Sequence, residues 1–161
     1  MSAKRVLSLM SLLTLVVLVV AACGQSSSET GQAAPNSAQE AAGGEAVDIK
    51  TLPKNADGYT DITVQQLSQV MPTKDFTLVN VHIPYQGEIP QTDLFVPYDQ
   101  ISDHQNELPA KDAPIVLYCS SGNMSTQAAK SLAGLGYTNI LELDGGFNAW
   151  TAAGYELIKS Q

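Results

Sequence analysis

The segment PIVLYCSSGNMSTQAAKSLAGLG, residues 114–136, indicates how the chain folds. It opens with a near-continuous apolar run, 114–118, which is typical of a central parallel strand that is buried on both faces. A helix-like stretch ends the segment, and Ser125 is its expected N-cap residue while Gly136 ends it. Its inward stripe is formed by Ala128, Ala129, Leu132 and Leu135. The segment therefore predicts a strand, a short turn and a helix.

Cys119 lies at the junction of the predicted strand and turn. Free cysteine often serves only as a small buried hydrophobic residue. Here, however, it is followed by small or polar residues, which suit a turn whose backbone N–H groups face an anion at a helix N-terminus. Such surroundings favour a thiolate. We therefore take Cys119 as the candidate catalytic residue, and the candidate substrate-binding loop is Ser120, Ser121, Gly122, Asn123, Met124 and Ser125.

This loop resembles that of the rhodanese family of sulfurtransferases, whose active-site cysteine heads a Cys-x-x-Gly-x-Arg-Ser loop between a central parallel strand and a helix. Cys119, Gly122 and Ser125 match the pattern. The likeness spans roughly residues 59–155 and includes LVNVH at 78–82, GEIP at 87–90 and LDGGFNAW at 143–150. The resemblance implies a rhodanese-like three-layer α/β domain with a central, mostly parallel sheet and helices on both faces.

Ser120 and Met124 occupy sites where the family commonly has arginines that help to hold an anionic sulfur donor. Weak activity with thiosulfate is therefore expected. Asn80 and His82 replace an Asp and an Arg that are thought to brace the family's fold as a charged pair, although a neutral pair can still hydrogen-bond.

The remaining segments are expected to complete the sheet and its covering helices. Thr63-Val64-Gln65-Gln66 has capping-box form and predicts a helix through Val70 that Pro72 ends. A last helical segment is expected at 148–153. Further strands are predicted at 48–52, 60–62, 76–81 and 140–143.

Three features outside the loop are given structural roles. Trp150 is expected in the core, since its side chain buries a large area. The proline-containing stretch 84–103 is expected to be a packed connection. His82 and His104 could act as acids or bases, but roles as a hydrogen-bonded strand-end histidine and a surface histidine are favoured.

Residues 1–22 are expected to be a signal peptide, because Lys4 and Arg5 precede a short apolar core and small residues. The sequence VAAC at 20–23 resembles the bacterial lipobox, in which Cys23 is lipidated and becomes the mature N-terminus. The alternative is an ordinary signal peptide with an incidental cysteine. The lipobox implies a protein anchored by lipid to the extracytoplasmic face of a bacterial cell membrane.

Residues 23–46 comprise the lipidated cysteine and a segment rich in Ser, Gln, Ala, Gly and Glu that has no aromatic residue. Such a composition buries too little apolar surface to fold. It is expected to act as a flexible linker with a reach of roughly 25 to 30 Å. Residues 47–161 are assigned to the rhodanese-like domain.

The charge balance excludes several classes of partner. Without residues 1–22 the chain has six basic and 16 acidic residues, a net charge of −10. Arg5 is the only arginine, so the mature protein has no guanidinium for nucleic-acid binding or for clamping an oxyanion.

With Cys23 lipidated, Cys119 has no partner cysteine for a disulfide. The two cysteines and two histidines lack metal-ligand spacing, so neither a metal site nor a cofactor is expected.

Two functions remain open. The first is a lipid-anchored sulfurtransferase or sulfane-sulfur carrier, in which Cys119 takes sulfur from a small donor as a persulfide and passes it to a thiol, another nucleophile or a protein acceptor. The second is a non-catalytic or redox-sensing rhodanese-like binding module, which the absence of both loop arginines could reflect. The related cysteine-dependent phosphatases require Cys-x5-Arg, and Ser125 at the arginine position argues against that chemistry.

Overall fold

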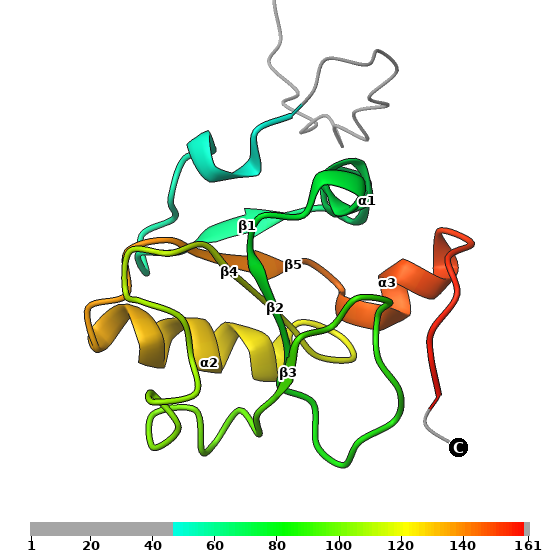
Figure 1. Ribbon diagram of the computed structural model, residues 1–161. Helices are drawn as coiled ribbons and strands as arrows, with labels where there is room; N and C mark the ends of the chain where they lie inside the picture. Colours follow the sequence, from blue (N-terminus) through cyan, green and yellow to red (C-terminus); the bar gives the residue numbers. More distant parts are fainter. Residues whose placement is uncertain (1–46, 160–161) are drawn as a thin grey trace, which may run out of the picture. The chain divides into compact units, whose positions relative to one another are not determined.

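The computed structural model describes residues 47–159. Within them, five strands form one sheet in the order β1-β5-β4-β2-β3, and each neighbouring pair is parallel (Figure 1). The strands are β1 (Thr60–Ile62), β2 (Thr77–Asn80), β3 (Leu94–Phe95), β4 (Ile115–Tyr118) and β5 (Ile140–Leu143). The expected α/β class with a parallel central sheet is confirmed.

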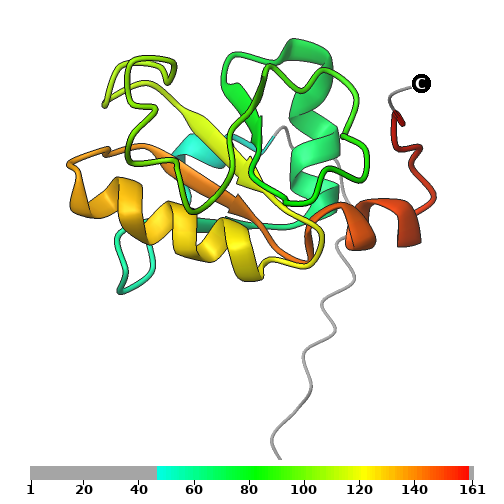
Figure 2. The same ribbon diagram turned by 90° about the horizontal axis from the view of Figure 1, so that it is seen from below.

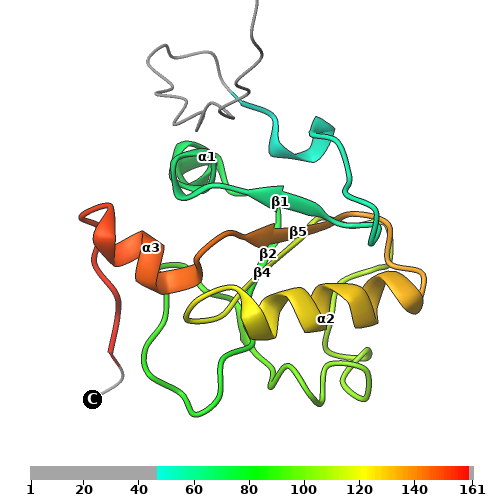
Figure 3. The ribbon, with the colours of Figure 1, turned by 180° about the vertical axis from the view of Figure 1, so that it is seen from behind.

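Helices cover both faces of this sheet. α1 (Val64–Val70) lies over one face and α2 (Asn123–Gly134) over the other, as the views from opposite sides in Figures 1 and 3 show. α3 (Gly146–Ala152) follows β5 and shares the core of α1. Two short 3-10 helices, η1 (Ile49–Thr51) and η2 (Met71–Thr73), flank the first strand and helix. The predicted three-layer arrangement is confirmed.

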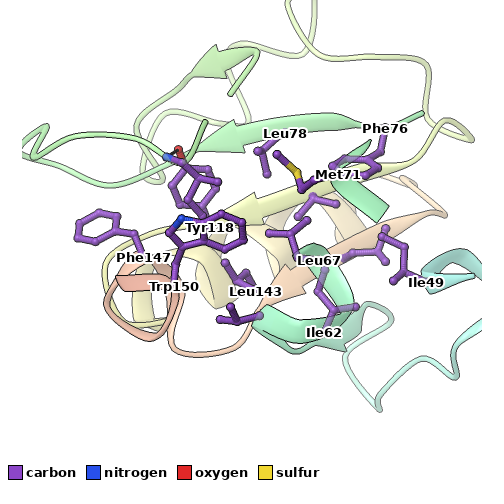
Figure 4. Close-up of a cluster of buried hydrophobic side chains, with 14 residues drawn as sticks. Ile49, Ile62, Leu67, Met71, Phe76, Leu78, Tyr118, Leu143, Phe147 and Trp150 are labelled. Atoms are coloured by element: carbon purple, nitrogen blue, oxygen red, sulfur yellow. Dashed lines mark hydrogen bonds between the residues drawn. The ribbon is translucent and has the colours of Figure 1, made fainter. Parts of the chain in front are cut away.

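The core on the α1 face is a continuous apolar cluster. Leu67 of α1, Tyr118 of β4 and Trp150 of α3 all contribute to it (Figure 4). Trp150 is a core residue, as predicted, and its indole Nε1 donates to the Glu156 carbonyl oxygen at 3.0 Å. Each large apolar side chain buried in this way stabilises the fold by about 1.5 to 3 kcal/mol.

The opposite face is filled by α2 and by the long connection between β3 and β4. Figure 2, seen from below, shows both on this side of the sheet. Ala128 and Leu132 of α2 are buried here beside Ile101 and Leu108 of the connection. Cys119 belongs to the same cluster. Because β4 is covered on both faces, its four residues are all buried, which explains their unbroken apolar character.

Several local predictions are confirmed. Thr63 forms a reciprocal capping box with Gln66, and α1 gives way at Met71 to the 3-10 turn that contains Pro72. The stretch 84–103 is a packed connection, because Ile89, Val96 and Ile101 are buried. It also contains β3, which the sequence analysis did not predict.

Two local predictions are wrong. Residues 48–52 form no strand, because Asp48 accepts a hydrogen bond from Lys50 N and so caps the 3-10 helix η1. Ser125 is not the N-cap of α2. The cap is Gly122, in a left-handed conformation with φ of 97°, and Ser125 lies inside the first helical turn. The Ser125 hydroxyl instead contacts Cys119 Sγ and Glu142 Oε1.

The predicted signal peptide 1–22, the lipidation site Cys23 and the linker 23–46 lie outside the described residues. Among residues 47–159, no helix is long and apolar enough to span a bilayer.

Candidate active site

Cys119 directly follows β4, at the carboxyl edge of the parallel sheet. Ligand sites of open parallel sheets lie outside the carboxyl ends of the strands. Three residues separate Cys119 from the start of α2 at Asn123, so the cysteine, the turn and the first helical turn form one compact unit. The structure thus brings together the predicted loop residues, 119–125.

Two hydrogen-bond donors face the Cys119 sulfur. The Gly122 backbone N–H lies 3.1 Å from Sγ, and the Ser125 hydroxyl oxygen lies 3.4 Å from it. The first turn of α2 adds N–H groups that have no intrahelical partner. Donors of this kind stabilise a thiolate, or an anionic sulfur carried on it, in the absence of a charged side chain. Cys119 is buried, with 1% of its surface exposed.

The outer residues of the loop differ in exposure. Ser121 and Asn123 are exposed, whereas Ser120 and Met124 are half-buried. Met124 packs against the apolar cluster that contains Cys119. No charged side chain therefore extends from positions 120 and 124 toward a donor.

The first turn of α3 donates two backbone hydrogen bonds to the loop that contains Cys119. Phe147 N donates to the Cys119 carbonyl oxygen at 2.9 Å, and Asn148 N donates to the Ser120 carbonyl oxygen at 3.0 Å. These bonds orient the two peptide groups that follow β4. The GGFN part of the closing sequence LDGGFNAW is thus a brace for the cysteine loop.

Glu142 is a site residue that the sequence analysis missed. It lies in β5, is 1% exposed, and its Oε1 accepts a short hydrogen bond from the buried Ser125 hydroxyl. Burial raises the pKa of Glu142 to about 7; the Ser125 hydrogen bond opposes this shift, whereas the negative charges of Asp144 and Asp61 add to it. An acidic residue in a strand that is otherwise apolar was the available signal, since Glu is rarely buried without a partner.

Asp61 of β1 and Asp144, just after β5, complete an acidic cluster with Glu142 in which one oxygen of each lies within 4.8 Å of the others. Burial, and then the charge of Asp61, raises the pKa of Asp144 above its ordinary value. Asp61 and Asp144 are exposed, and Glu142 is bonded to Ser125. We assign the cluster an electrostatic effect on Glu142. The expected lack of a metal site and cofactor stays a prediction.

The two histidines differ in setting. His104 is a surface residue, as favoured, and its Nδ1 lies 2.7 Å from Glu107 Oε1. The buried His82 ring makes a T-shaped contact with the Phe147 ring, and neither of its nitrogens has a hydrogen-bond partner among the described residues. The expectation of a hydrogen-bonded ring at this strand end was therefore wrong. It is the His82 backbone N–H that donates to Asn80 Oδ1, at 3.0 Å.

Asn80 braces this strand end in a different way from the charged pair of the family. Its side-chain Nδ2 donates to the Gly87 carbonyl oxygen at 3.0 Å. The amide therefore ties the end of β2 to the connection that follows, using neutral hydrogen bonds on both sides.

Together, the parallel sheet and the loop define a class of α/β domains that present a cysteine between a central strand and a helix N-terminus. Comparison with protein families identifies a rhodanese-like domain over residues 63–153. This chain belongs to the rhodanese-like domain family.

Relatives with assigned names are consistent with this membership. The chain is 37% identical over 102 residues to a protein of Allochromatium vinosum named sulfurtransferase, a match that covers 61% of this chain and 94% of that protein. It is 49% identical over 41 residues to the thiosulfate sulfurtransferase GlpE of Ectopseudomonas mendocina, covering 26% of this chain and 38% of that protein.

Among solved structures, a rhodanese-like domain protein of Staphylococcus aureus has a TM-score of 0.53 and 29% sequence identity. The match covers 63% of this chain and 99% of the Staphylococcus aureus chain.

Proposed function

We propose that this chain is a sulfurtransferase or sulfane-sulfur carrier in which Cys119 carries the transferred sulfur as a persulfide. The observation that carries the proposal is the pair of donors, Gly122 N and Ser125 Oγ, that face Cys119 Sγ. The names of the relatives support the same reaction class.

In the proposed first step, the Cys119 thiolate attacks the outer sulfur of a small persulfide, polysulfide or thiosulfate. A bond forms between Sγ and that sulfur, while the sulfur–sulfur bond of the donor breaks and its electron pair leaves with the remaining thiolate or sulfite. In the second step an acceptor nucleophile attacks the outer sulfur and the Cys119 thiolate is released. Neither step needs an external oxidant or reductant, because each breaks one bond to the transferred sulfur and forms another.

The backbone N–H groups of the loop suit this chemistry, because they can stabilise the negative charge that the outer sulfur of a persulfide carries. Neutral or singly charged donors are favoured over doubly charged thiosulfate, because the residues beyond 22 carry a net charge of −10 and no arginine.

The test is mass spectrometry of the purified full-length protein after incubation with a sulfane-sulfur donor. A gain of one sulfur atom on Cys119, removed by a thiol acceptor, is the expected result. Cys119→Ser is the control and should gain nothing. A protein that folds but takes up no sulfur from thiosulfate, persulfide or polysulfide donors contradicts the proposal.

The second candidate is a redox-sensing or non-catalytic binding module. It is favoured by the burial of the Cys119 sulfur and by the absence of both loop arginines. This module would gain oxygen on Cys119 after peroxide treatment, or remain unmodified, and would not gain sulfur from any donor.

We also propose that the domain, residues 47–161, is held at the extracytoplasmic face of a bacterial membrane. In this proposal residues 1–22 are a lipoprotein signal peptide, and residues 23–46 are the lipidated Cys23 and the flexible linker that follows it. Support comes from the VAAC sequence at 20–23 and from the composition that follows it. Sulfur acceptors would then be small thiols or protein thiols outside the cytoplasm.

A further inference from the structure

The Ser125 hydroxyl has more neighbours than it can serve. Its oxygen lies 3.4 Å from Cys119 Sγ and 3.1 Å from the Gly122 carbonyl oxygen, and it also bonds Glu142 Oε1. A hydroxyl donates one hydrogen and accepts with its lone pairs. Only one of the three neighbours can therefore receive that hydrogen.

We propose that Glu142 is a positioning residue which, as a neutral acid, donates to Ser125 Oγ and so directs the serine hydrogen to the Cys119 sulfur. The proposal rests on the proposed function, since it assigns a role in preparing the sulfur that carries the transferred atom. Glu142 itself does not touch Sγ; it acts through Ser125.

Two arrangements follow from this geometry. With Glu142 neutral, its carboxyl O–H donates to Ser125 Oγ. The serine hydrogen then points to the Cys119 sulfur, which also faces the Gly122 N–H. With Glu142 ionised, the carboxylate takes the serine hydrogen, the sulfur keeps Gly122 N alone, and a second negative charge lies behind the serine. An anionic sulfur at position 119 therefore has one donor fewer when Glu142 is ionised.

The surroundings of Glu142 favour the neutral form. The titratable groups that face it are Asp61 from β1, Asp144 from the turn after β5, and Cys119 beyond Ser125 of α2. Among residues 47–159, no cationic side chain is ion-paired with it. Its raised pKa, about 7, is consistent with a carboxyl that is largely protonated in mildly acidic solution.

Three variants of the full-length protein separate positioning from charge. Glu142→Gln keeps a side-chain N–H that can donate to Ser125 Oγ at every pH. Glu142→Leu keeps the approximate volume but lacks a donor, so the Gly122 carbonyl oxygen, 3.1 Å from Ser125 Oγ, competes with the sulfur for the serine hydrogen. Asp61→Asn is the matched control: it removes one neighbouring negative charge and leaves the contact between Glu142 and Ser125 intact.

The readouts are the ultraviolet absorbance of the thiolate and the rate of alkylation by neutral iodoacetamide, each followed across pH with Cys119→Ser as the blank. At pH about 6, Glu142→Gln should match the wild type and Glu142→Leu should react about tenfold more slowly, because no donor at position 142 holds the serine hydrogen toward the sulfur and the Gly122 carbonyl oxygen competes for it. At pH about 8, roughly one pH unit above the pKa of Glu142, Glu142→Gln should react about tenfold faster than the wild type. Asp61→Asn should keep the wild-type attenuation at alkaline pH.

The inference is overturned if Glu142→Gln and Glu142→Leu behave alike, or if Asp61→Asn reproduces the effect of Glu142→Gln. In a Ser125→Ala background, Glu142→Gln and Glu142→Leu should give the same pH profile, and a persisting difference would also overturn it. None of these measurements uses a sulfur donor. A protein that shows the expected profiles but forms no persulfide therefore rejects the proposed function and retains the role of Glu142, and the converse result rejects only the latter.

Discussion

The backbone of Gly146 packs directly against the carbonyl group of Cys119. A Cβ atom built at position 146 would lie 2.1 Å from the Cys119 carbonyl oxygen and 2.8 Å from the carbonyl carbon. This approach allows the next residue, Phe147, to donate its backbone N–H to the same oxygen. The second glycine of the closing sequence is thus required by the backbone of the cysteine loop, with which it is in direct contact.

Gly146→Ala should destabilise the protein by about 3 kcal/mol or more, because the added methyl group must displace buried backbone and also disfavours the φ of 55°. Gly136→Ala is the control: its φ is also positive, at 88°, but open space surrounds the added Cβ, so only about 1 to 2 kcal/mol is expected. Urea denaturation measures both. Equal losses would show that backbone conformation, rather than contact with Cys119, limits position 146.

The stability of the protein should fall as pH rises between about 4.5 and about 7. The pKa of Glu142 is raised from 4.5 to about 7 in the folded state, so the unfolded chain releases this proton first. The folded state then binds more protons than the unfolded state, and the free energy of unfolding decreases with pH by up to about 3 kcal/mol from this group.

Glu142→Gln should remove most of that slope, so that the variant is more stable than the wild type at pH about 8 and shows little of this gain at pH about 5. Denaturation at both values tests this. Glu156→Gln, at an exposed position, is the matched control and should follow the wild type. A wild-type slope retained in Glu142→Gln would place the titration elsewhere.

Met124→Arg should improve the use of thiosulfate. The side chain is half-buried at the start of α2, where an arginine stem can pack while its head reaches the donor. A charge-assisted contact of roughly 1 to 3 kcal/mol corresponds to about a 5- to 150-fold gain in kcat/KM. Steady-state kinetics at low and high salt, with Met124→Leu as the uncharged control, provide the measurement. The gain should shrink at high salt, and a variant no better than wild type at low salt means that charge at this position does not limit donor use.

Cys23→Ala should prevent lipidation and leave the folded domain unchanged, because residues 24–46 separate the two. Mass spectrometry of the N-terminus and fractionation after a salt wash measure the first effect, and thermal unfolding measures the second. A Cys23→Ala protein that still partitions wholly with membranes would contradict the lipoprotein proposal.

The correct predictions from sequence concern features encoded by neighbours along the chain. The apolar run before Cys119, the capping box of Thr63 and Gln66, and the strand at 140–143 each depend on residues within a few positions of one another. Periodicity and capping chemistry suffice for such elements. Where a local rule failed, at Ser125, the side chain was engaged by groups outside its own helix.

The features that sequence reasoning missed join distant parts of the chain. Glu142 meets Ser125 across 17 positions, because parallel pairing sets β5 beside β4 and the side-chain alternation of β5 turns Glu142 toward α2. Gly146 meets Cys119 because α3 begins just after β5, which pairs with β4, the strand that leads into Cys119. A one-residue change in strand register would turn Glu142 to the opposite face. Cys119 is therefore identifiable as a candidate from the amino-acid order alone. The contact of Glu142 with Ser125, by contrast, forms only once the strands are paired, since register and burial depend on the whole sheet.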